Sequence, residues 1–230
     1  MKNYNPKGKL IVIDGIDGAG KATQTKLLLE KLKESGKAAE TMDFPRYYDN
    51  FFGKLIGRFL NNEFGDAPNV NPYLASVLYA ADRFESKEKI SAWLKDGKIV
   101  ILDRYASSNQ IHQGGKIHDT IEKETFLKWL EEMEFEVFKI PKPDAIIFLN
   151  VPYDYSKDLL KKKSARDYIK KAKNDKVEKD KQYQTSSYIQ SLDLVKKYNN
   201  WLEINCVENN ELLPPDKISD LVWNKLKNII

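Results

Sequence analysis

An apolar run, Lys9-Leu-Ile-Val-Ile-Asp14, leads directly into a glycine-rich loop, Gly15-Ile-Asp-Gly-Ala-Gly-Lys21. The run is short and rich in β-branched residues, which predicts a buried strand. The glycines let the backbone wrap closely around an anion, with several N–H groups pointing inward. Residues 20–35 then show helical spacing and stop at Gly36, a common helix terminator. This junction therefore predicts a strand, a phosphate-binding loop and a helix, in that order.

The loop matches the G-x-x-x-x-G-K frame of the P-loop between a strand and a helix, and Lys21 can reach the β and γ oxygens of a bound nucleotide. The next residue is Ala22, where the frame has a Ser or Thr whose hydroxyl ligates Mg²⁺; Thr23 lies one position later. Mg²⁺ keeps several waters and can be held largely by phosphates. We therefore expect nucleotide binding with a weakened protein contribution to the metal site.

Strands and helices alternate along the rest of the chain. We predict further strands at 37–43, 98–103, 144–150 and 201–206, and further helices at 51–60, 72–95, 120–139, 154–173, 176–200 and 215–229. Strands separated by helices imply a parallel sheet covered on both faces, with ligands beyond the carboxyl ends of the strands. We expect one domain over residues 1–230, a three-layer α/β P-loop fold with a five-stranded parallel sheet.

The composition is that of a folded protein of a reducing compartment. The 230 residues are 41% hydrophobic and 31% charged, and the one cysteine, Cys206, cannot form an internal disulfide. No run of about 18 apolar residues predicts a membrane span. The first residues lack the apolar region of a signal peptide. We expect a cytoplasmic protein without a membrane partner.

The positive charge is concentrated in one segment. The net charge is +4, but residues 157–181 contain ten Lys and one Arg against five acids. A nucleic-acid binder more often spreads its basic surface along a face of the fold, so we expect no nucleic-acid partner. The segment suits a lid, over about 154–181, that closes on a compact polyanion. A lysine-rich solvated helix is the alternative.

Two further clusters carry chemistry. Asp103-Arg104-Tyr105 ends the strand at 98–103, where a carboxylate can receive a Mg²⁺-bound water and an arginine can hold a phosphate in bidentate fashion. Tyr79 and Arg83 lie four apart in a predicted helix, so the ring and the guanidinium share one face. That pair suits a flat heteroaromatic base, although a core tyrosine and a surface arginine would give the same spacing.

In this order the motifs resemble the thymidylate kinases, nucleoside-monophosphate kinases that phosphorylate dTMP with ATP. The similarity extends over essentially the whole chain. It includes Gly15 to Gln24, Phe44-Pro45, Asn71-Pro-Tyr73, Ala80-Ala-Asp-Arg83, Asp103-Arg-Tyr105, Pro141-Lys-Pro-Asp144 and Asp175-Lys-Val-Glu178. The resemblance implies ATP and dTMP as ligands, a role in dTTP synthesis, Mg²⁺ held mainly through phosphates and water, and a homodimer packed through helices.

The resemblance also implies a role for each matching residue. ATP would contact the phosphate loop and the loop at 205–210, that is Gly15, Asp17, Gly18, Ala19, Gly20, Lys21, Ala22, Thr23, Asn205, Cys206 and Val207. The 3′-hydroxyl of dTMP would contact Asp17, and its phosphate would contact Arg104 and Arg46. Its ring would stack between Phe44, with the adjacent Pro45, and Tyr79, and its O4 would meet Arg83. Ser108 and Asn109 would line the pyrimidine pocket. The catalytic set would be Lys21, Arg104, Arg166 and Asp103, with Asp103 near the metal.

The chain departs from the family at two more positions. One branch carries a catalytic arginine in the loop, where this chain has Gly18; the other branch supplies it from the lid, where Arg166 is the one arginine of the basic segment. The family arginine after Phe-Pro often stands one residue later, where this chain has Tyr47, so the role of Arg46 is the less secure.

Two other functions fit parts of the pattern. A deoxynucleoside kinase would need a general base for a neutral 5′-hydroxyl, and Asp43 could be given that role. A non-catalytic nucleotide-binding switch would fit Ala22 in the loop. His112 and His118 are interpreted as local hydrogen-bonding residues, because no zinc-ligand spacing is present.

Overall fold

The computed structural model describes residues 8–157, 159 and 181–230. Its main sheet has five parallel strands, as predicted, and their order is β2-β3-β1-β4-β5. The strands are β1 (Lys9–Asp14), β2 (Ala39–Asp43), β3 (Ile99–Asp103), β4 (Ala145–Asn150) and β5 (Trp201–Asn205).

The strand order places β1 at the centre of the sheet. It pairs with β3 on one side and with β4 on the other, so successive connections lead away from it in opposite directions. In parallel sheets a crevice opens at such a switch point, beyond the carboxyl ends of the strands. The glycine loop that follows Asp14 therefore begins at the edge of this crevice.

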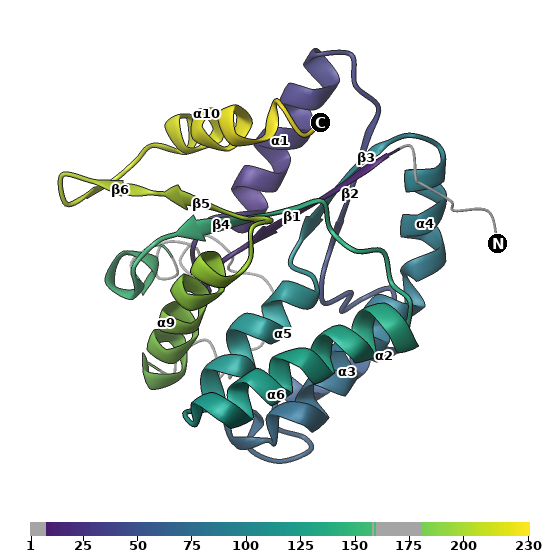
Figure 1. The fold of residues 1–230 in the computed structure, drawn as a ribbon, viewed down its shortest axis with the longest axis vertical. Helices are drawn as coiled ribbons and strands as arrows, with labels where there is room; N and C mark the ends of the chain where they lie inside the picture. Colours follow the sequence, from purple (N-terminus) through teal and green to yellow (C-terminus); the bar gives the residue numbers. More distant parts are fainter. Residues whose placement is uncertain (1–7, 158, 160–180) are drawn as a thin grey trace.

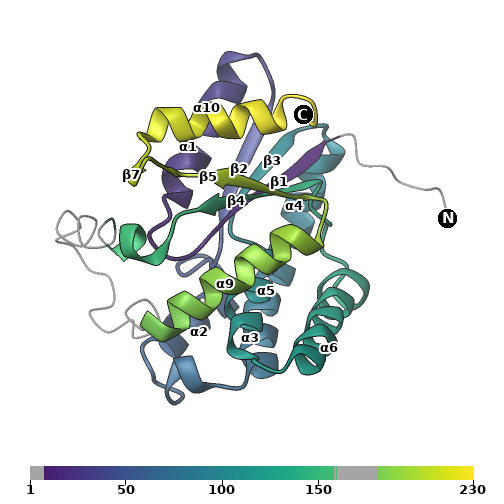
Figure 2. The ribbon, with the colours of Figure 1, turned by 60° about the vertical axis from the view of Figure 1, so that its left-hand side comes forward.

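The residues of β1 alternate between two hydrophobic cores because successive side chains of a strand point to opposite faces. Ile11 and Ile13 pack in the core covered by α1 (Lys21–Glu34) and α10 (Pro215–Leu226). Leu10 and Val12 pack in the other core. Figure 1 and Figure 2 show α1 and α10 together on one side of the sheet and α5, α6 and α9 on the other.

The second face carries most of the helices that surround the crevice. They are α3 (Pro72–Glu85), α4 (Lys87–Lys95), α5 (Ala106–His112), α6 (Thr120–Glu131) and α9 (Lys181–Lys197), with α2 (Phe51–Leu60) packed on α3. Two 3₁₀ turns, Ala67–Asn69 and Gly114–Lys116, connect them. The three-layer arrangement predicted from the sequence is confirmed.

Four elements differ from the prediction. The helix expected over 72–95 is two helices, because Ser86 is the C-cap of α3 and the N-cap of α4. The helix expected to reach residue 139 leaves α geometry after Glu131 and continues as a π-helix, Glu132–Val137. Helix α5 and a short antiparallel hairpin, β6 (Val207–Glu208) with β7 (Glu211–Leu212), were not predicted.

Residues 160–180 lie outside the described residues. They include most of the predicted lid, most of the helix predicted at 154–173 and the start of the helix predicted at 176–200. Within the described part of the chain, no helix combines the length and apolar character needed to cross a bilayer.

Two glycines of α2 provide a matched test of the packing beside the crevice. A Cβ on Gly53 would lie 2.0 Å from the backbone oxygen of Arg46, whereas a Cβ on Gly57 would meet its nearest neighbour, a Tyr47 ring carbon, at 3.7 Å. We expect Gly53→Ala to lower the free energy of unfolding by about 1–3 kcal/mol, because backbone must move. Gly57→Ala should raise it by about 0.5–1 kcal/mol through helix propensity. Urea unfolding of both variants checks the opposite signs; equal changes would contradict the packing described.

Candidate active site

The glycine loop forms a tight turn over a buried lysine. Gly20, the N-cap of α1, has φ 88°, a left-handed conformation that favours glycine. The Nζ of Lys21 donates to the carbonyl oxygens of Gly15 at 3.0 Å and Ile16 at 2.8 Å. Burial, together with the nearby charge of Arg104, lowers the pKa of Lys21 to about 8. The loop therefore holds its lysine close beneath the turn.

A buried carboxylate joins the end of β1 to helix α5. The Asp14 side chain accepts hydrogen bonds from the backbone N–H of Gly15 at 2.9 Å and from the hydroxyl of Ser107 at 2.6 Å. The hydroxyl of Ser108 donates to the same carboxylate at 2.9 Å. This contact sets the distance between the glycine loop and the first turn of α5.

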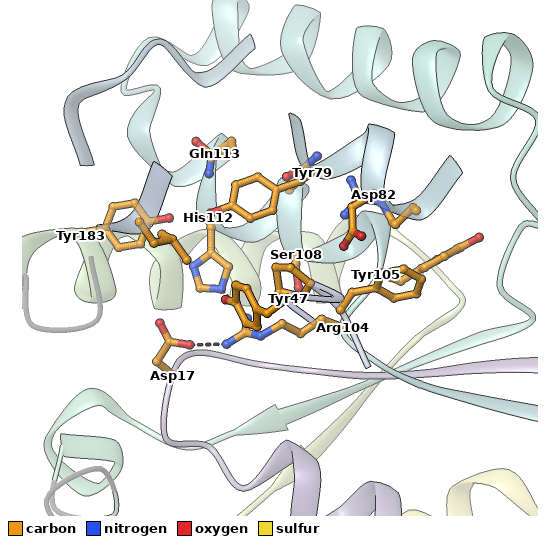
Figure 3. Close-up of a pocket in the computed structure, with 15 residues that line it drawn as sticks. Asp17, Tyr47, Tyr79, Asp82, Arg104, Tyr105, Ser108, His112, Gln113 and Tyr183 are labelled. Carbon is orange, nitrogen blue, oxygen red and sulfur yellow. Dashed lines mark hydrogen bonds and ion pairs between the residues drawn. The ribbon is translucent and has the colours of Figure 1, made fainter. Parts of the chain in front are cut away.

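Arg104 stands at the end of β3 in an unusual conformation. Its φ is 69°, in the left-handed region that a non-glycine residue adopts at a cost in energy. Its backbone N–H donates to Ile13 at 3.0 Å, which ties the residue to the central strand. Its guanidinium forms an ion pair with Asp17 of the glycine loop, and Figure 3 shows the two side chains facing each other across the pocket floor.

The Asp17–Arg104 pair stays charged at neutral pH, as the pKa values of the two residues show. Burial by itself would raise the pKa of Asp17, but the charges of Arg104 and Lys21 outweigh it and lower that pKa well below its usual range. The pKa of Arg104 is raised, because Asp17, Asp14 and Asp103 outweigh the opposing effect of burial. Burial raises the pKa of Asp103. At neutral pH Asp17 is therefore an ionised carboxylate and Arg104 an ionised guanidinium.

Helix α9 closes a ring of hydrogen bonds around this pair. The amide of Gln184 donates to Asp17 at 2.8 Å. Nε2 of His112 lies 3.0 Å from Nη1 of Arg104, and its Nδ1 lies 3.1 Å from the hydroxyl of Ser187. Because a guanidinium can only donate, His112 accepts through Nε2 and donates through Nδ1, which makes it a neutral imidazole. Burial accordingly lowers its pKa to about 4.

Beside the Asp17–Arg104 pair lies an open pocket with about 630 Å³ of empty space, its mouth included. It brings together eight residues that were predicted to bind the substrate: Asp17, Phe44, Pro45, Tyr79, Arg83, Arg104, Ser108 and Asn109. Its other lining residues are Tyr47, Leu60, Asp82, Tyr105, His112, Gln113 and Tyr183.

Some predicted site residues lie elsewhere. Arg46 is not among the described pocket-lining residues; its guanidinium pairs with Asp43 and Asp49. Lys21 and Asp103 also lie outside that lining, on the side of the glycine loop. The segment predicted to contact adenine begins where β5 ends and enters the β6–β7 hairpin. Its Cys206 is fully buried, and Arg166 lies outside the described residues.

Three residues in or behind the pocket were not predicted from the sequence. The ring of Tyr183 stacks on His112 with the two planes 2° apart, and both belong to segments assigned no ligand contact. Glu134 forms a buried ion pair with Arg83. A signal for Glu134 was present, because it stands four residues after the buried Leu130, where continued helical spacing predicts an apolar side chain.

His112 is a hydrogen-bonding residue, as interpreted, with Arg104 and Ser187 as its partners. Among the described residues, no group of three or more His, Cys, Asp or Glu side chains is placed to hold a metal ion.

A glycine loop between the central strand of a parallel sheet and its first helix is the defining unit of the P-loop nucleotide-binding proteins. A family model described as thymidylate kinase matches residues 13–214. The chain therefore belongs to the thymidylate kinase family.

Similar proteins carry the same description. The thymidylate kinase of Mycobacterium tuberculosis is 30% identical over 158 residues, which cover 69% of this chain and 73% of that protein. The human thymidylate kinase is 33% identical over 146 residues, covering 63% and 62%. The solved structure of the Candida albicans thymidylate kinase shares the fold, with a TM-score of 0.73, 23% identity, and coverage of 96% and 92%.

The neutral state of His112 makes stability depend on pH. The pKa of His112 is about 4 in the native state, and a histidine in an unfolded chain has a pKa of about 6.5. As pH falls between these two values, the unfolded chain takes up a proton that the native protein does not, and unfolding is favoured. The free energy of unfolding should therefore fall below about pH 6.5 and level off near pH 4, by at most about 3 kcal/mol. We expect His112→Gln to flatten this dependence in urea titrations between pH 7.5 and 4.5. His118→Gln, at an exposed position, is the control and should leave the slope unchanged.

Proposed function

We propose that this chain phosphorylates dTMP to dTDP with ATP, as an ATP-dependent nucleoside-monophosphate kinase that acts in dTTP synthesis. The observation that carries the proposal is the Asp17–Arg104 pair, which stands between the phosphate loop and an aromatic, polar-lined pocket. A triphosphate on the loop and a nucleotide in the pocket would bring two phosphates to the same arginine. The names of the family and of its similar members supply the nucleoside.

Each ligand has a set of residues suited to it. For ATP, the glycine loop with Lys21 would hold the phosphates, and residues 205–210 would contact the adenine. For dTMP, Phe44 and Tyr79 border the pocket where the base would stack, and Asp17 is placed for a sugar hydroxyl. Arg104 would bind the acceptor phosphate, and its present partners, a carboxylate and an imidazole, show that it is oriented without a ligand.

The transfer needs no general base. A phosphate oxygen of dTMP is already anionic at neutral pH, so catalysis consists of alignment and stabilisation of charge on the transferred group. Asp43, the residue that a deoxynucleoside kinase would use as base, is exposed and paired with Arg46. That arrangement favours a phosphate acceptor over a sugar hydroxyl.

Mg²⁺ would be held mainly by phosphates and water. Asp103 has a half-buried carboxyl group that accepts no hydrogen bond from the described residues, so it is available to a metal-bound water. Ala22 offers no hydroxyl, and the oxygens of Asp14 are already engaged by Ser107 and Ser108. The donor set therefore fits a hydrated ion near Asp103, which would neutralise charge on the phosphates of ATP.

The lid residue Arg166 completes the catalytic set of the proposal. Lys21, Arg104 and Arg166 would surround the transferred phosphoryl group, with Lys161–Lys163 adding charge. Arg166 is proposed on the family pattern and on its being the one arginine in the basic segment.

A panel of acceptors tests the function. With ATP and Mg²⁺ we expect dTDP from dTMP and no product from thymidine, measured by chromatography of the nucleotides. Arg104→Lys should lower kcat/KM for dTMP by about 100-fold, because a lysine cannot hold phosphate in bidentate fashion. Arg58→Lys, at an exposed pair with Glu63, is the matched control. Phosphorylation of thymidine, or nucleotide binding without any dTDP, would support the two rejected alternatives instead.

We also propose that the protein is a cytoplasmic homodimer that pairs through α2 and α3. Helix α3 presents three apolar side chains along one stripe, Leu74, Val77 and Phe84, which are 69%, 43% and 48% exposed. An apolar hollow adjoins the stripe and is lined by Leu55, Phe59, Phe64, Val70, Leu74, Ala75 and Leu78. Exposed apolar surface of this kind marks an interface, and a second copy would cover it.

Sedimentation tests the dimer. We expect a mass near twice 26.6 kDa for the protein and a monomer for the double variant Leu74→Glu/Val77→Glu, since buried charges would oppose pairing. Ile121→Glu, at another exposed apolar position, on α6, is the control and should remain dimeric. A monomer at all concentrations would refute the assignment of this surface.

A further inference from the structure

Arg83 and Glu134 form an ion pair that is almost completely removed from solvent, with side chains 3% and 1% exposed. Nε of Arg83 donates to Glu134 at 3.1 Å, and Nη2 donates to the other carboxylate oxygen, so the contact is bidentate. A bidentate pair fixes the plane of the guanidinium. Nη1 has no hydrogen-bond partner among the described residues, and Arg83 lines the substrate pocket.

The same carboxylate also orients Asn109. The Nδ2 group of Asn109 lies 3.4 Å from Glu134 and donates to the backbone oxygen of Ser76 at 3.1 Å. Both neighbours are acceptors, so turning the amide over would place its oxygen against two oxygens. The Oδ1 atom of Asn109 is left as the free acceptor on a residue that lines the pocket.

We propose that Glu134 is the positioning residue that sets which pyrimidines this kinase accepts. Through one buried carboxylate it leaves the pocket with a fixed donor, Nη1 of Arg83, and a fixed acceptor, Oδ1 of Asn109. A base with an oxygen at C4 and a hydrogen on N3 complements this pair. A base with an amino group at C4 and an unprotonated N3 would place that amino donor against Nη1 of Arg83 and the N3 acceptor against Oδ1 of Asn109. The inference rests on the proposed function, because it concerns the acceptor of that same reaction.

The local backbone supports this role. Glu134 lies in the π-helix Glu132–Val137 that follows α6, and such turns occur frequently at functional sites. Its neighbours Met133 and Leu130 are buried apolar residues. A carboxylate at this position is costly unless it is fully partnered, and here Arg83 and Asn109 are its partners.

The test compares dTMP with 5-methyl-dCMP, which has the same shape and methyl group but the opposite hydrogen-bonding edge. The native protein should prefer dTMP in kcat/KM by about 100-fold or more, because a site with buried polar groups rejects a mismatched edge strongly. Glu134→Gln should reduce this preference at least about tenfold, since the neutral amide no longer imposes one orientation on Asn109. Saturating kcat with dTMP should change less than the preference does.

A second variant and a control separate positioning from folding. Glu134→Asp keeps the negative charge opposite Arg83 but withdraws the oxygen from Asn109, so it should fold and lose part of the preference. Glu136→Gln, in the same π-helix at an exposed pair with Lys142, should behave like the native protein. Circular dichroism confirms that each variant is folded.

Two results would overturn the inference. The first is a folded Glu134→Asp or Glu134→Gln variant whose activity falls equally with both nucleotides, which is what a purely structural ion pair would give. The second is a native protein that accepts 5-methyl-dCMP as well as dTMP. Failure of the proposed function has a different signature, the absence of dTDP from the native protein. In that case titration calorimetry with the two nucleotides still measures the preference.

Discussion

The ion pair between Asp17 and Arg104 is the interaction on which the site depends. It joins the glycine loop after β1 to the end of β3, and it holds a guanidinium in a half-buried place that would be unfavourable without a charged partner. Because Arg104 adopts a left-handed backbone conformation, it is held from both sides, by Ile13 through its N–H and by Asp17 and His112 through its side chain. Under the proposed function, this orientation in advance would reduce the reorganisation required when the acceptor phosphate binds.

Helix α9 extends this arrangement from the pocket towards the basic segment. Its residues Gln184 and Ser187 bond to Asp17 and His112, and its Tyr183 stacks on the imidazole. The first described residue of α9, Lys181, is the last residue of the basic stretch. Helix α9 therefore connects the hydrogen bonds around Arg104 with the end of the basic stretch in the sequence.

A second carboxylate, Glu134, organises the opposite end of the pocket. Asp17 meets the arginine suited to a phosphate, and Glu134 meets the arginine suited to a base. In both pairs the acid restrains the guanidinium and leaves part of its donor capacity to the pocket. The two ends differ in solvent access: the Asp17 and Arg104 side chains are 19% and 20% exposed, whereas Glu134 and Arg83 are almost fully enclosed. The phosphate end can exchange with water, and the base end is preformed.

Local pattern was sufficient to predict the five-stranded parallel sheet and the glycine loop and to place Arg104 at a strand end, because apolar periodicity and glycine spacing are properties of neighbouring residues. Spacing alone left Tyr79 and Arg83 open between a base site and the core, and the resemblance to the family assigned them to the substrate. It could not predict the break at Ser86 or the π-helix, which depend on how α3 and α6 pack. Nor could it predict that Arg46 turns to Asp43 and Asp49, that His112 and Tyr183 line the pocket, or that Glu134 pairs with Arg83. Asp43 and Asp49 each lie three residues from Arg46, so that pairing depends on the local turn. His112, Tyr183 and Glu134 lie far apart in the sequence and come together because α5, α9 and the π-helix after α6 cover the same face of the sheet. Long-range packing, which no short stretch encodes, therefore decided the companions of Arg83 and Arg104.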